Sequence, residues 1–185
     1  RSNVSIVYKA SNPQLESLVA IKILNNVELF SEDLSERFFR EIKFLSALEH
    51  RNIVKVFGAG MVGKRPFLVM EFIEGKSLDQ IISSGISTAQ AMPIFIQICD
   101  GLSYIHSQGI VHRDIKPSNV MIVARDKIAK IIDLGIAKSI KTAGLEAQKL
   151  TQAGAFVGSL AYASPEQIRS ENIDERSDIY SFGCL

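Results

Sequence analysis

Hydrophobic and polar residues alternate along the first part of the chain, which is the period of a half-buried β-strand. Val4, Ile6 and Tyr8 alternate with polar positions, and turn signals follow at residues 12–13 and 63–64. The strands expected on this basis are one around residues 4–8 and others at residues 19–24, 53–57 and 67–70.

The period changes to that of a helix in two places. Ser31 is followed by acidic residues, as at many helix starts, and the next apolar residues recur every three or four positions. This first stripe consists of Phe38, Ile42, Leu45 and Leu48. The stripe of a second, longer helix consists of Met92, Phe95, Cys99, Leu102 and Ile105 or His106. Gly109 stands where a C-terminal glycine cap would end this helix.

Residues 71–76 are the expected link between a strand-rich part and a mainly helical part. A short strand pair, at residues 120–123 and 128–132, follows the long helix. This order of elements indicates the α+β class. Residues 1–73 are expected to form a small strand-rich part with one helix, and residues 74–185 a mainly helical part.

The composition is that of a folded soluble protein. Hydrophobic residues make up 46% and charged residues 22% of the 185 residues, and the net charge of +1 indicates no nucleic-acid partner. Apolar stretches are interrupted well before the roughly 18 residues of a membrane span, so no membrane segment is expected. Cys99 and Cys184 fit no metal or redox spacing, and we expect two buried thiols rather than a disulfide.

The strongest chemical signal is the segment His112-Arg113-Asp114-Ile115-Lys116-Pro117-Ser118-Asn119. It places an acid, two cations and an amide in one loop between a helix and a strand. Phosphoryl transfer requires a carboxylate to orient and deprotonate the attacking hydroxyl, a cation to neutralise the moving phosphoryl group, and oxygen ligands for Mg²⁺. A polar loop with a helix-capping aspartate would explain any one of these residues, but it does not explain the ordered set.

Two further features carry charge into apolar surroundings. Asp133-Leu134-Gly135 follows the apolar strand at residues 128–132 and presents an oxygen ligand at its end, although Asp before Gly is also a common turn. Lys22 lies within an apolar strand, and Glu41 borders the apolar stripe of its helix. Because an unpaired buried charge is costly, Lys22 and Glu41 are expected to pair; separate solvation of each is the alternative.

These residues resemble the signature of the protein kinase family, over essentially the whole chain. The matching segments, in the family's order, are Val19-Ala20-Ile21-Lys22, Glu41, residues 112–119, Asp133-Leu134-Gly135, Ser164-Pro165-Glu166 and Asp178. The resemblance implies an α+β bilobal fold. Its N-lobe, at residues 1–73, would be a small antiparallel sheet with one helix, and its C-lobe, at residues 74–185, would be mainly helical. Lys116-Pro117 and Ser159 are typical of the serine/threonine branch, and Ser164-Pro165-Glu166-Gln167 is typical of bacterial members.

The resemblance implies a role for each matching loop residue. Asp114 is expected to be the catalytic base, and Lys116 is expected to reach the γ-phosphate of ATP. Asn119 and Asp133 are expected to bind Mg²⁺. The implied partners are ATP, Mg²⁺ and a protein substrate with a serine or threonine hydroxyl, with a kinase dimer as one route to autophosphorylation.

The resemblance also implies an ATP-binding set. Lys22 is expected to hold the α- and β-phosphates, and Glu41 to brace it. The expected adenine-binding residues are Val7, Ala20 and Met121 as apolar walls, Met70 at the back of the pocket, and the backbone groups of Glu71 and Ile73.

A regulatory segment is expected between Asp133 and Glu166. This segment contains Thr142, Thr151 and Ser159. Arg113 resembles the residue that receives an activation-loop phosphate in related kinases, and Thr151 is the preferred site for that phosphate. An unmodified loop is the alternative. The implied location is cytoplasmic, either alone or as the intracellular part of a larger membrane-anchored protein.

Some positions depart from the family pattern. Ser2 and Ser5 stand where glycines of the phosphate-covering loop are expected, and Leu134 replaces the usual Phe. A pseudokinase that binds nucleotide without turnover is therefore one alternative, and a small-molecule phosphotransferase of the antibiotic- or choline-kinase type is another. The chain ends at Leu185 within a helical pattern, so we expect a piece of a longer protein that lacks the first strand and the last helices of the kinase fold.

Overall fold

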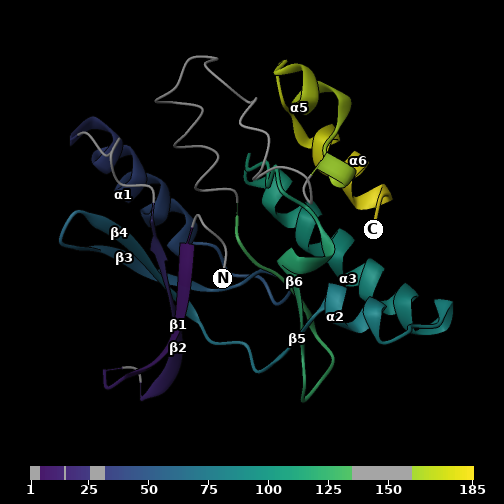
Figure 1. Cartoon of the computed structure of the whole chain (residues 1–185), viewed down its shortest axis with the longest axis horizontal. Helices are drawn as coiled ribbons and strands as arrows, with labels where there is room; N and C mark the ends of the chain where they lie inside the picture. The colour runs from purple at the N-terminus through teal and green to yellow at the C-terminus, as the bar shows by residue number, and fades with distance from the viewer. Residues whose placement is uncertain (1–4, 15, 26–31, 135–159) are drawn as a thin grey trace. The chain divides into compact units, whose positions relative to one another are not determined.

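The computed structural model describes residues 5–14, 16–25, 32–134 and 160–185. The contacts divide the chain into two compact units, whose elements are labelled in Figure 1. The first unit comprises Arg1–Glu49 and Val54–Ile73, and the second comprises His50–Ile53 and Glu74–Leu185. Among the described residues, no helix is both long enough and apolar enough to cross a membrane.

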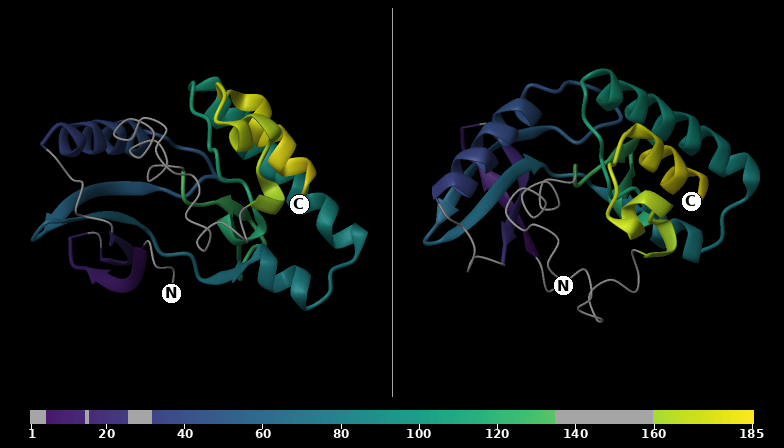
Figure 2. Two further views of the ribbon diagram at one scale, coloured as in Figure 1. Left: turned by 45° about the horizontal axis from the view of Figure 1, so that its top comes forward. Right: turned by 90° about the horizontal axis from the view of Figure 1, so that it is seen from above.

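The first unit is an antiparallel sheet with one helix. Its elements are β1 (Ser5–Asn12), β2 (Ser17–Leu24), α1 (Glu32–Ser46), β3 (Val56–Val62) and β4 (Arg65–Glu71). The strand order is β1-β2-β4-β3, and all neighbouring pairs are antiparallel. The predicted stripe of Phe38, Ile42, Leu45 and Leu48 is confirmed, since all four side chains are buried. Figure 2 shows α1 lying along the sheet of this unit.

The strand predicted at residues 53–57 is displaced. β3 begins at Val56, and Ile53 instead makes an isolated parallel bridge with Ile131 in the second unit. The reason is a buried polar side chain, because the Asn52 amide donates to the carbonyl oxygen of Ala129 at 2.8 Å. That bond holds the segment before β3 against a different sheet.

The second unit contains a three-stranded sheet and several helices. Its strands are β5 (Gly75–Ser77), β6 (Val120–Val123) and β7 (Ala129–Ile131). Its helices are α2 (Leu78–Ser83), α3 (Thr88–Ser107), α5 (Pro165–Arg169) and α6 (Glu175–Gly183), with 3₁₀ turns at Pro117–Asn119 and Leu160–Tyr162. The sheet order is β5-β6-β7, and both pairs are antiparallel.

The stripe predicted on α3 was partly wrong. The buried apolar side chains are Ile94, Ile98, Leu102 and Ile105, whereas Met92 and Cys99 are exposed. Phe95 packs edge-on against Phe182 of α6, with ring centroids 5.8 Å apart, and both views of Figure 2 show these two helices side by side. The middle of α3 carries apolar residues on several faces, so the sequence pattern alone does not identify the buried one.

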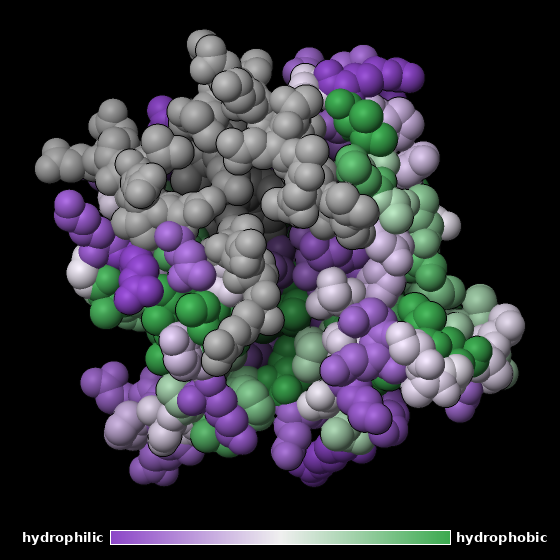
Figure 3. Space-filling model, viewed as in Figure 1, coloured by the Kyte–Doolittle hydropathy of each residue, from purple (hydrophilic) through white to green (hydrophobic). Residues whose placement is uncertain are grey.

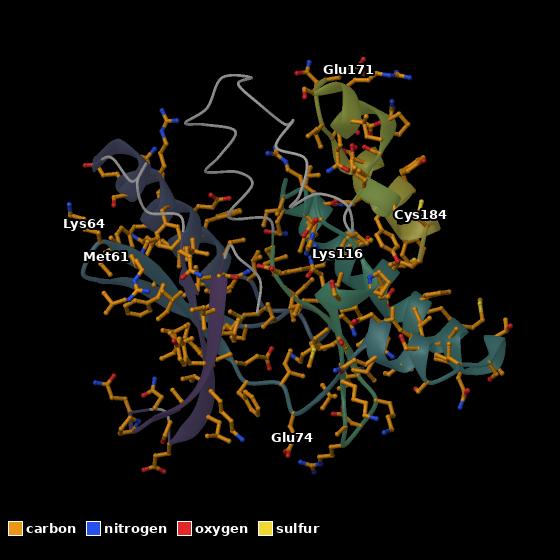
Figure 4. The ribbon with its side chains drawn as sticks, in the orientation of Figure 1. Met61, Lys64, Glu74, Lys116, Glu171 and Cys184 are labelled. Carbon is orange, nitrogen blue, oxygen red and sulfur yellow. The ribbon has the colours of Figure 1, made fainter. Side chains whose placement is uncertain are left out.

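Both cysteines are free thiols, but the expectation that they are buried was wrong. Cys99 and Cys184 are exposed, the first on α3 and the second at the end of α6, where Figure 4 labels it. Partial burial, together with the Asp100 carboxylate, raises the pKa of the Cys99 thiol. The thiol is therefore less reactive than an unperturbed cysteine.

The predicted glycine cap of α3 is confirmed. Gly109 has a φ of 72°, which favours glycine, and its N–H donates to the carbonyl of His106 at 2.9 Å. The N–H of Ile110 donates to the carbonyl of Ile105 at 2.9 Å, which completes a Schellman motif. This cap ends the helix and directs the chain into the segment at residues 112–119.

Candidate active site

The charged loop at residues 112–119 lies in the second unit, between α3 and β6. His112 is fully buried at its start. Its Nε2 lies 3.0 Å from the carbonyl oxygen of Ile132, and its Nδ1 accepts from the N–H of Asp114 at 3.2 Å. Because a carbonyl only accepts and an N–H only donates, these two partners place the ring proton on Nε2. The imidazole therefore joins the backbone of Asp114 to the residue that precedes Asp133.

Asp178 of α6 holds the same loop from another side. Its carboxylate is fully buried and accepts from the backbone N–H groups of His112 and Arg113, each at 2.7 Å. It also accepts from Nε2 of His106 at 2.8 Å. A buried carboxylate is costly unless it is hydrogen-bonded, and here three donors satisfy it.

The sequence analysis recognised Asp178 as part of the kinase signature but assigned it no role. A signal was available, because Asp178 lies between Ser177 and Ser181 on a short helix whose buried residues are all polar. Its partners lie more than 60 positions away, however, and Arg113 is 65 positions from Asp178. Only the fold shows which backbone groups it binds.

Asp114, Lys116 and Asn119 form one cluster of charged and polar groups. The Lys116 Nζ lies 2.9 Å from Oδ2 of Asp114, and the Asn119 amide donates to the same oxygen at 2.9 Å. The Asn119 amide also donates to the backbone carbonyl of Asp114 at 2.8 Å. Figure 4 labels Lys116 within the loop of the second unit that carries these side chains. The structure thus brings the side chains of Asp114, Lys116 and Asn119 together, and their catalytic roles stay predictions.

The same geometry turns the side-chain oxygen of Asn119, Oδ1, away from Asp114, because the side-chain nitrogen, Nδ2, makes both bonds to Asp114. The backbone of Asn119 is joined to the neighbouring strand, since the N–H of Ile132 donates to its carbonyl at 2.9 Å. Val120 pairs with Ile131 in the β6–β7 register, so Asp133 lies two residues beyond the paired position. An amide oxygen and a carboxylate oxygen therefore lie on adjacent segments.

These two oxygen donors fit Mg²⁺, which prefers oxygen ligands and is commonly bound by one or two carboxylates together with substrate phosphates. Within the described part of the chain, no three His, Cys, Asp or Glu side chains form a metal-binding group. The binding of Mg²⁺ by Asn119 and Asp133 stays a prediction. Asp133 has a φ of 67°, a backbone conformation that Asp adopts more readily than most residues.

In the first unit, four predicted ATP-binding residues lie on one face of the sheet. Val7 pairs with Lys22 in the β1–β2 register, and Ala20 pairs with Met70 in the β2–β4 register. Directly paired residues share a face, and residues two positions apart in a strand also share it. Val7 is 59% exposed on this face, and its contact with adenine stays a prediction. Glu41 lies on α1 of the same unit, and its pairing with Lys22 stays a prediction.

Glu71 ends β4 and is fixed by Lys55 before β3. The N–H of Lys55 donates to Oε1 of Glu71 at 2.8 Å, and the N–H of Glu71 donates to the carbonyl of Lys55 at 2.9 Å. The Lys55 ammonium donates to the carbonyls of Ser46 and Leu48 at 3.1 and 3.3 Å and pairs with Glu49 at 3.1 Å. Lys55 therefore caps the end of α1 and joins it to the end of β4.

The remaining predicted residues are distributed as follows. Ile73 is half-buried at the end of the first unit, and Met121 is half-buried in β6 of the second. Arg113 is half-buried in the loop, with a φ of 64°. Thr142, Thr151 and Ser159 lie outside the described residues, so the predicted regulatory sites stay predictions.

Glu166 lies at the start of α5 and accepts a short hydrogen bond from the hydroxyl of Ser177 on α6. That hydrogen bond is the main reason why the pKa of Glu166 is lowered; bonds from its own backbone N–H and from Ser164 add to the effect. The contact joins α5 to α6 at the residue directly before Gln167, whose amide contacts the loop.

An antiparallel sheet with one helix, followed by a helical unit that carries an acid–lysine–amide loop, defines a kinase-type fold. The protein kinase domain family matches residues 2–185, and the chain belongs to this family. Both the predicted family and the predicted α+β kinase fold are thereby confirmed.

Curated relatives include bacterial serine/threonine kinases. The chain is 40% identical over 182 residues to the serine/threonine-protein kinase pkn2 of Myxococcus xanthus, covering 97% of this chain and 22% of that protein. It is 36% identical over 188 residues to the serine/threonine-protein kinase PknB of Mycobacterium tuberculosis (strain H37Rv), covering 98% of this chain and 29% of that protein. The chain therefore spans less than a third of the length of these relatives.

Solved structures support the fold. The kinase domain of Mycobacterium tuberculosis PknI has a TM-score of 0.76 at 22% identity, covering 98% of this chain and 67% of that one. Rad53 in complex with AMP-PNP has a TM-score of 0.76 at 30% identity, covering 100% of this chain and 44% of that one.

Proposed function

We propose that this chain is the catalytic part of a serine/threonine protein kinase, which transfers the γ-phosphoryl group of ATP to a serine or threonine hydroxyl of a protein. The observation that carries the proposal is the cluster of Asp114, Lys116 and Asn119, in which two donors share one carboxylate oxygen. Bacterial relatives named as serine/threonine kinases, at 36–40% identity, support the choice of substrate class.

In this proposal Asp114 orients the acceptor hydroxyl and takes its proton. The hydroxyl oxygen forms the new bond to the γ-phosphorus, the bond from that phosphorus to the β–γ bridging oxygen breaks, and ADP leaves with the electron pair. Lys116 lies 2.9 Å from Asp114 and is well placed to neutralise charge on the transferred group. The buried His112 and Asp178 hold the backbone that carries the base.

Asn119 and Asp133 would hold the metal through one amide and one carboxylate oxygen, and Mg²⁺ when bound would neutralise the phosphate charge. Lys22 would bind the α- and β-phosphates, and Glu41 would orient it. The residues proposed to bind adenine are Val7, Ala20, Met70, Glu71, Ile73 and Met121. The nucleotide analogue bound by the related Rad53 structure supports a nucleotide as the ligand here.

The test compares the wild-type full-length protein with Asp114→Asn. Phosphate transfer from labelled ATP to a generic protein such as casein should fall by at least about 100-fold in the variant, because a general base contributes on this order. Asp79→Asn, an exposed aspartate in the first turn of α2, is the matched control and should keep full activity. The labelled amino acids should be phosphoserine and phosphothreonine.

Two results would overturn the proposal. A folded wild-type protein that binds ATP and Mg²⁺ but transfers no phosphate would be a pseudokinase. A protein that phosphorylates sugars or amines but no protein would be a small-molecule phosphotransferase.

We further infer activation by phosphorylation of Thr151, with Arg113 as the residue that receives the phosphate. Nearly two negative charges next to an arginine would order the segment that carries them. Mass spectrometry of active full-length protein should find phosphate on Thr151, and Thr151→Ala should lower activity while Thr142→Ala does not. Unmodified Thr151 in the active protein would contradict this choice. If phosphorylation occurs between two copies, its initial rate should rise with the square of protein concentration.

A further inference from the structure

The residue before the proposed catalytic base has a strained backbone. Arg113 has a φ of 64°, in the left-handed region that non-glycine residues rarely adopt. Such a conformation persists only where surrounding contacts hold it, because it is less stable than the ordinary alternatives. If Arg113 relaxed, the direction in which the chain enters Asp114 would change.

Two side chains hold the backbone of Arg113 from opposite ends. Its N–H donates to Oδ1 of the buried Asp178 at 2.7 Å. Its carbonyl oxygen accepts from Nε2 of Gln167 at 2.8 Å. The sequence analysis placed Gln167 in a bacterial-type segment but gave it no role, and the function proposed above does not use it.

The second end of the Gln167 amide is also engaged. The side-chain Oε1 of Gln167 accepts from the backbone N–H of Ser164 at 3.0 Å. The backbone N–H of Gln167 donates to the hydroxyl of Ser164 at 3.4 Å. Because a carbonyl must receive a donor and an N–H must receive an acceptor, the partners at the two ends fix the orientation of the amide. Ser164 is fully buried as the N-cap of α5, so the anchor is itself well held.

The chain offers two internal comparisons. α2 and α3 begin with the same Ser-x-x-Gln capping box, in which the oxygens of Gln80 and Gln90 accept from the N–H of Ser77 and Ser87. Among the described residues, no bond joins the amide nitrogen of Gln80 or Gln90 to the backbone of another element. Gln167 is thus a capping residue with an additional bond, and that bond ends on the loop that carries Asp114.

We propose that Gln167 is a positioning residue for phosphoryl transfer: its amide nitrogen holds the carbonyl of Arg113 and so fixes the direction of Asp114. The inference rests on the proposed kinase function, and it concerns the rate of transfer rather than ATP binding. Figure 3, drawn in the view of Figure 1, shows both hydrophilic and hydrophobic residues at the upper right, where Figure 1 labels α5 and α6.

The test is Gln167→Glu in the full-length protein. Glutamate serves in a capping box as well as glutamine does, but its ionised carboxylate has no N–H to donate to the carbonyl of Arg113. We expect kcat to fall about tenfold near neutral pH, with the KM for ATP unchanged within about twofold. Gln90→Glu makes the same chemical change in the box of α3 and should leave kcat unchanged.

Acid should rescue this variant. When the new carboxyl is protonated it has an O–H that donates to the carbonyl of Arg113, and a bond to the neutral form favours that form. The ratio of kcat between Gln167→Glu and wild type should therefore rise as the pH falls from about 8 to about 5.5. The charged and titratable residues of the adjoining elements are the same in both proteins, so the ratio reports the change at position 167; these residues are Arg113, Asp178, Glu166, Arg169, His106 and His112.

The outcomes separate this inference from the proposed function. An inactive wild type refutes the kinase function, and the positioning role is then measured by hydrogen exchange at the amides of Arg113 and Asp114, which should quicken in Gln167→Glu but not in Gln90→Glu. Full activity of Gln167→Glu near pH 8, or a loss that acid does not reverse, overturns the inference.

If Gln167→Glu does not fold, Gln167→Met is measured against Gln90→Met. Unchanged kcat overturns the inference, and so does failure of both Gln167 variants to fold, because Gln167 is then a folding residue.

Discussion

Replacing Asp178 with asparagine removes one charge and one acceptor from the interior of the second unit while it changes no volume. The carboxylate of Asp178 accepts from His112 N–H and Arg113 N–H at 2.7 Å each and from His106 Nε2 at 2.8 Å. An asparagine amide has only one oxygen. In either orientation its NH₂ group must face one of the two backbone N–H groups, so at least one donor loses its partner.

The magnitude follows from these contacts. A buried donor left without an acceptor costs about 1–3 kcal/mol, and the bonds that remain are no longer assisted by a charge. Asp178→Asn should therefore lower the free energy of unfolding by about 2–4 kcal/mol. Asp178→Ala should lower it by about 3–5 kcal/mol, because it leaves all three donors without acceptors in a buried site. Because the same bonds hold the backbone before Asp114, kcat should fall in the folded fraction as well.

Urea unfolding of the full-length protein, followed by a probe of the kinase domain, measures the stability change. Asp174→Asn is the matched control: this aspartate lies on the same helix, is exposed, and caps it by accepting from Arg176 N–H at 2.9 Å. Asparagine caps helices as well as aspartate does, so the control should change stability by less than about 0.5 kcal/mol. If Asp178→Asn costs no more than Asp174→Asn, the assigned role of this carboxylate is refuted.

Three other changes have outcomes set by single contacts. Ser177→Ala removes the hydrogen bond that is the main cause of the lowered pKa of Glu166. Because the folded-state pKa is below the ordinary value of 4.5, this hydrogen bond stabilises the fold fully above pH 4.5, and its stabilisation is lost as the pH falls through the folded-state pKa. Thermal midpoints of wild type and variant should therefore differ at neutral pH and converge in acid, and a constant difference would contradict the reasoning. Gly75→Ala would force a methyl group onto the backbone carbonyl of β6 and should cost about 1–3 kcal/mol in urea unfolding, whereas Gly183→Ala, with nothing within 4 Å, should cost none. Lys55→Met should cost about 1 kcal/mol and quicken amide exchange in the last turn of α1, while Lys55→Arg should not.

The parts of the site that could be predicted from the sequence are those whose residues lie close to one another along the chain. Asp114, Lys116 and Asn119 lie within six positions of one another, and one loop between a helix and a strand is enough to bring them together. The α1 stripe was also predictable, because its apolar residues follow a single face with charged residues on the other. The Gly109 cap followed from the same logic, since helix termination depends on a few adjacent residues.

The parts that sequence reasoning missed depend on partners far along the chain. Nothing near Asn52 indicates that its side chain binds Ala129, 77 positions later, so the start of β3 was placed too early. On α3, apolar residues at several faces left the choice of the buried one to tertiary packing. Cys99 illustrates the consequence: its thiol was expected to be buried and its position was placed on the apolar stripe, but the neighbouring Ile98 occupies the core instead.

The missed contacts and the predicted chemistry meet in the backbone of the loop. The side chains that would do the chemistry belong to residues 114–119, but the backbone that directs them is held by His112, Gln167 and Asp178 through bonds to main-chain groups. Such bonds do not depend on which side chain Arg113 carries, since they end on its N–H and carbonyl. Arg113→Ala should therefore leave the transfer rate of the unphosphorylated protein close to wild type while abolishing any gain from activation-segment phosphate. Loss of basal transfer in Arg113→Ala, measured with Thr151→Ala as background, would instead show that the arginine side chain holds the loop.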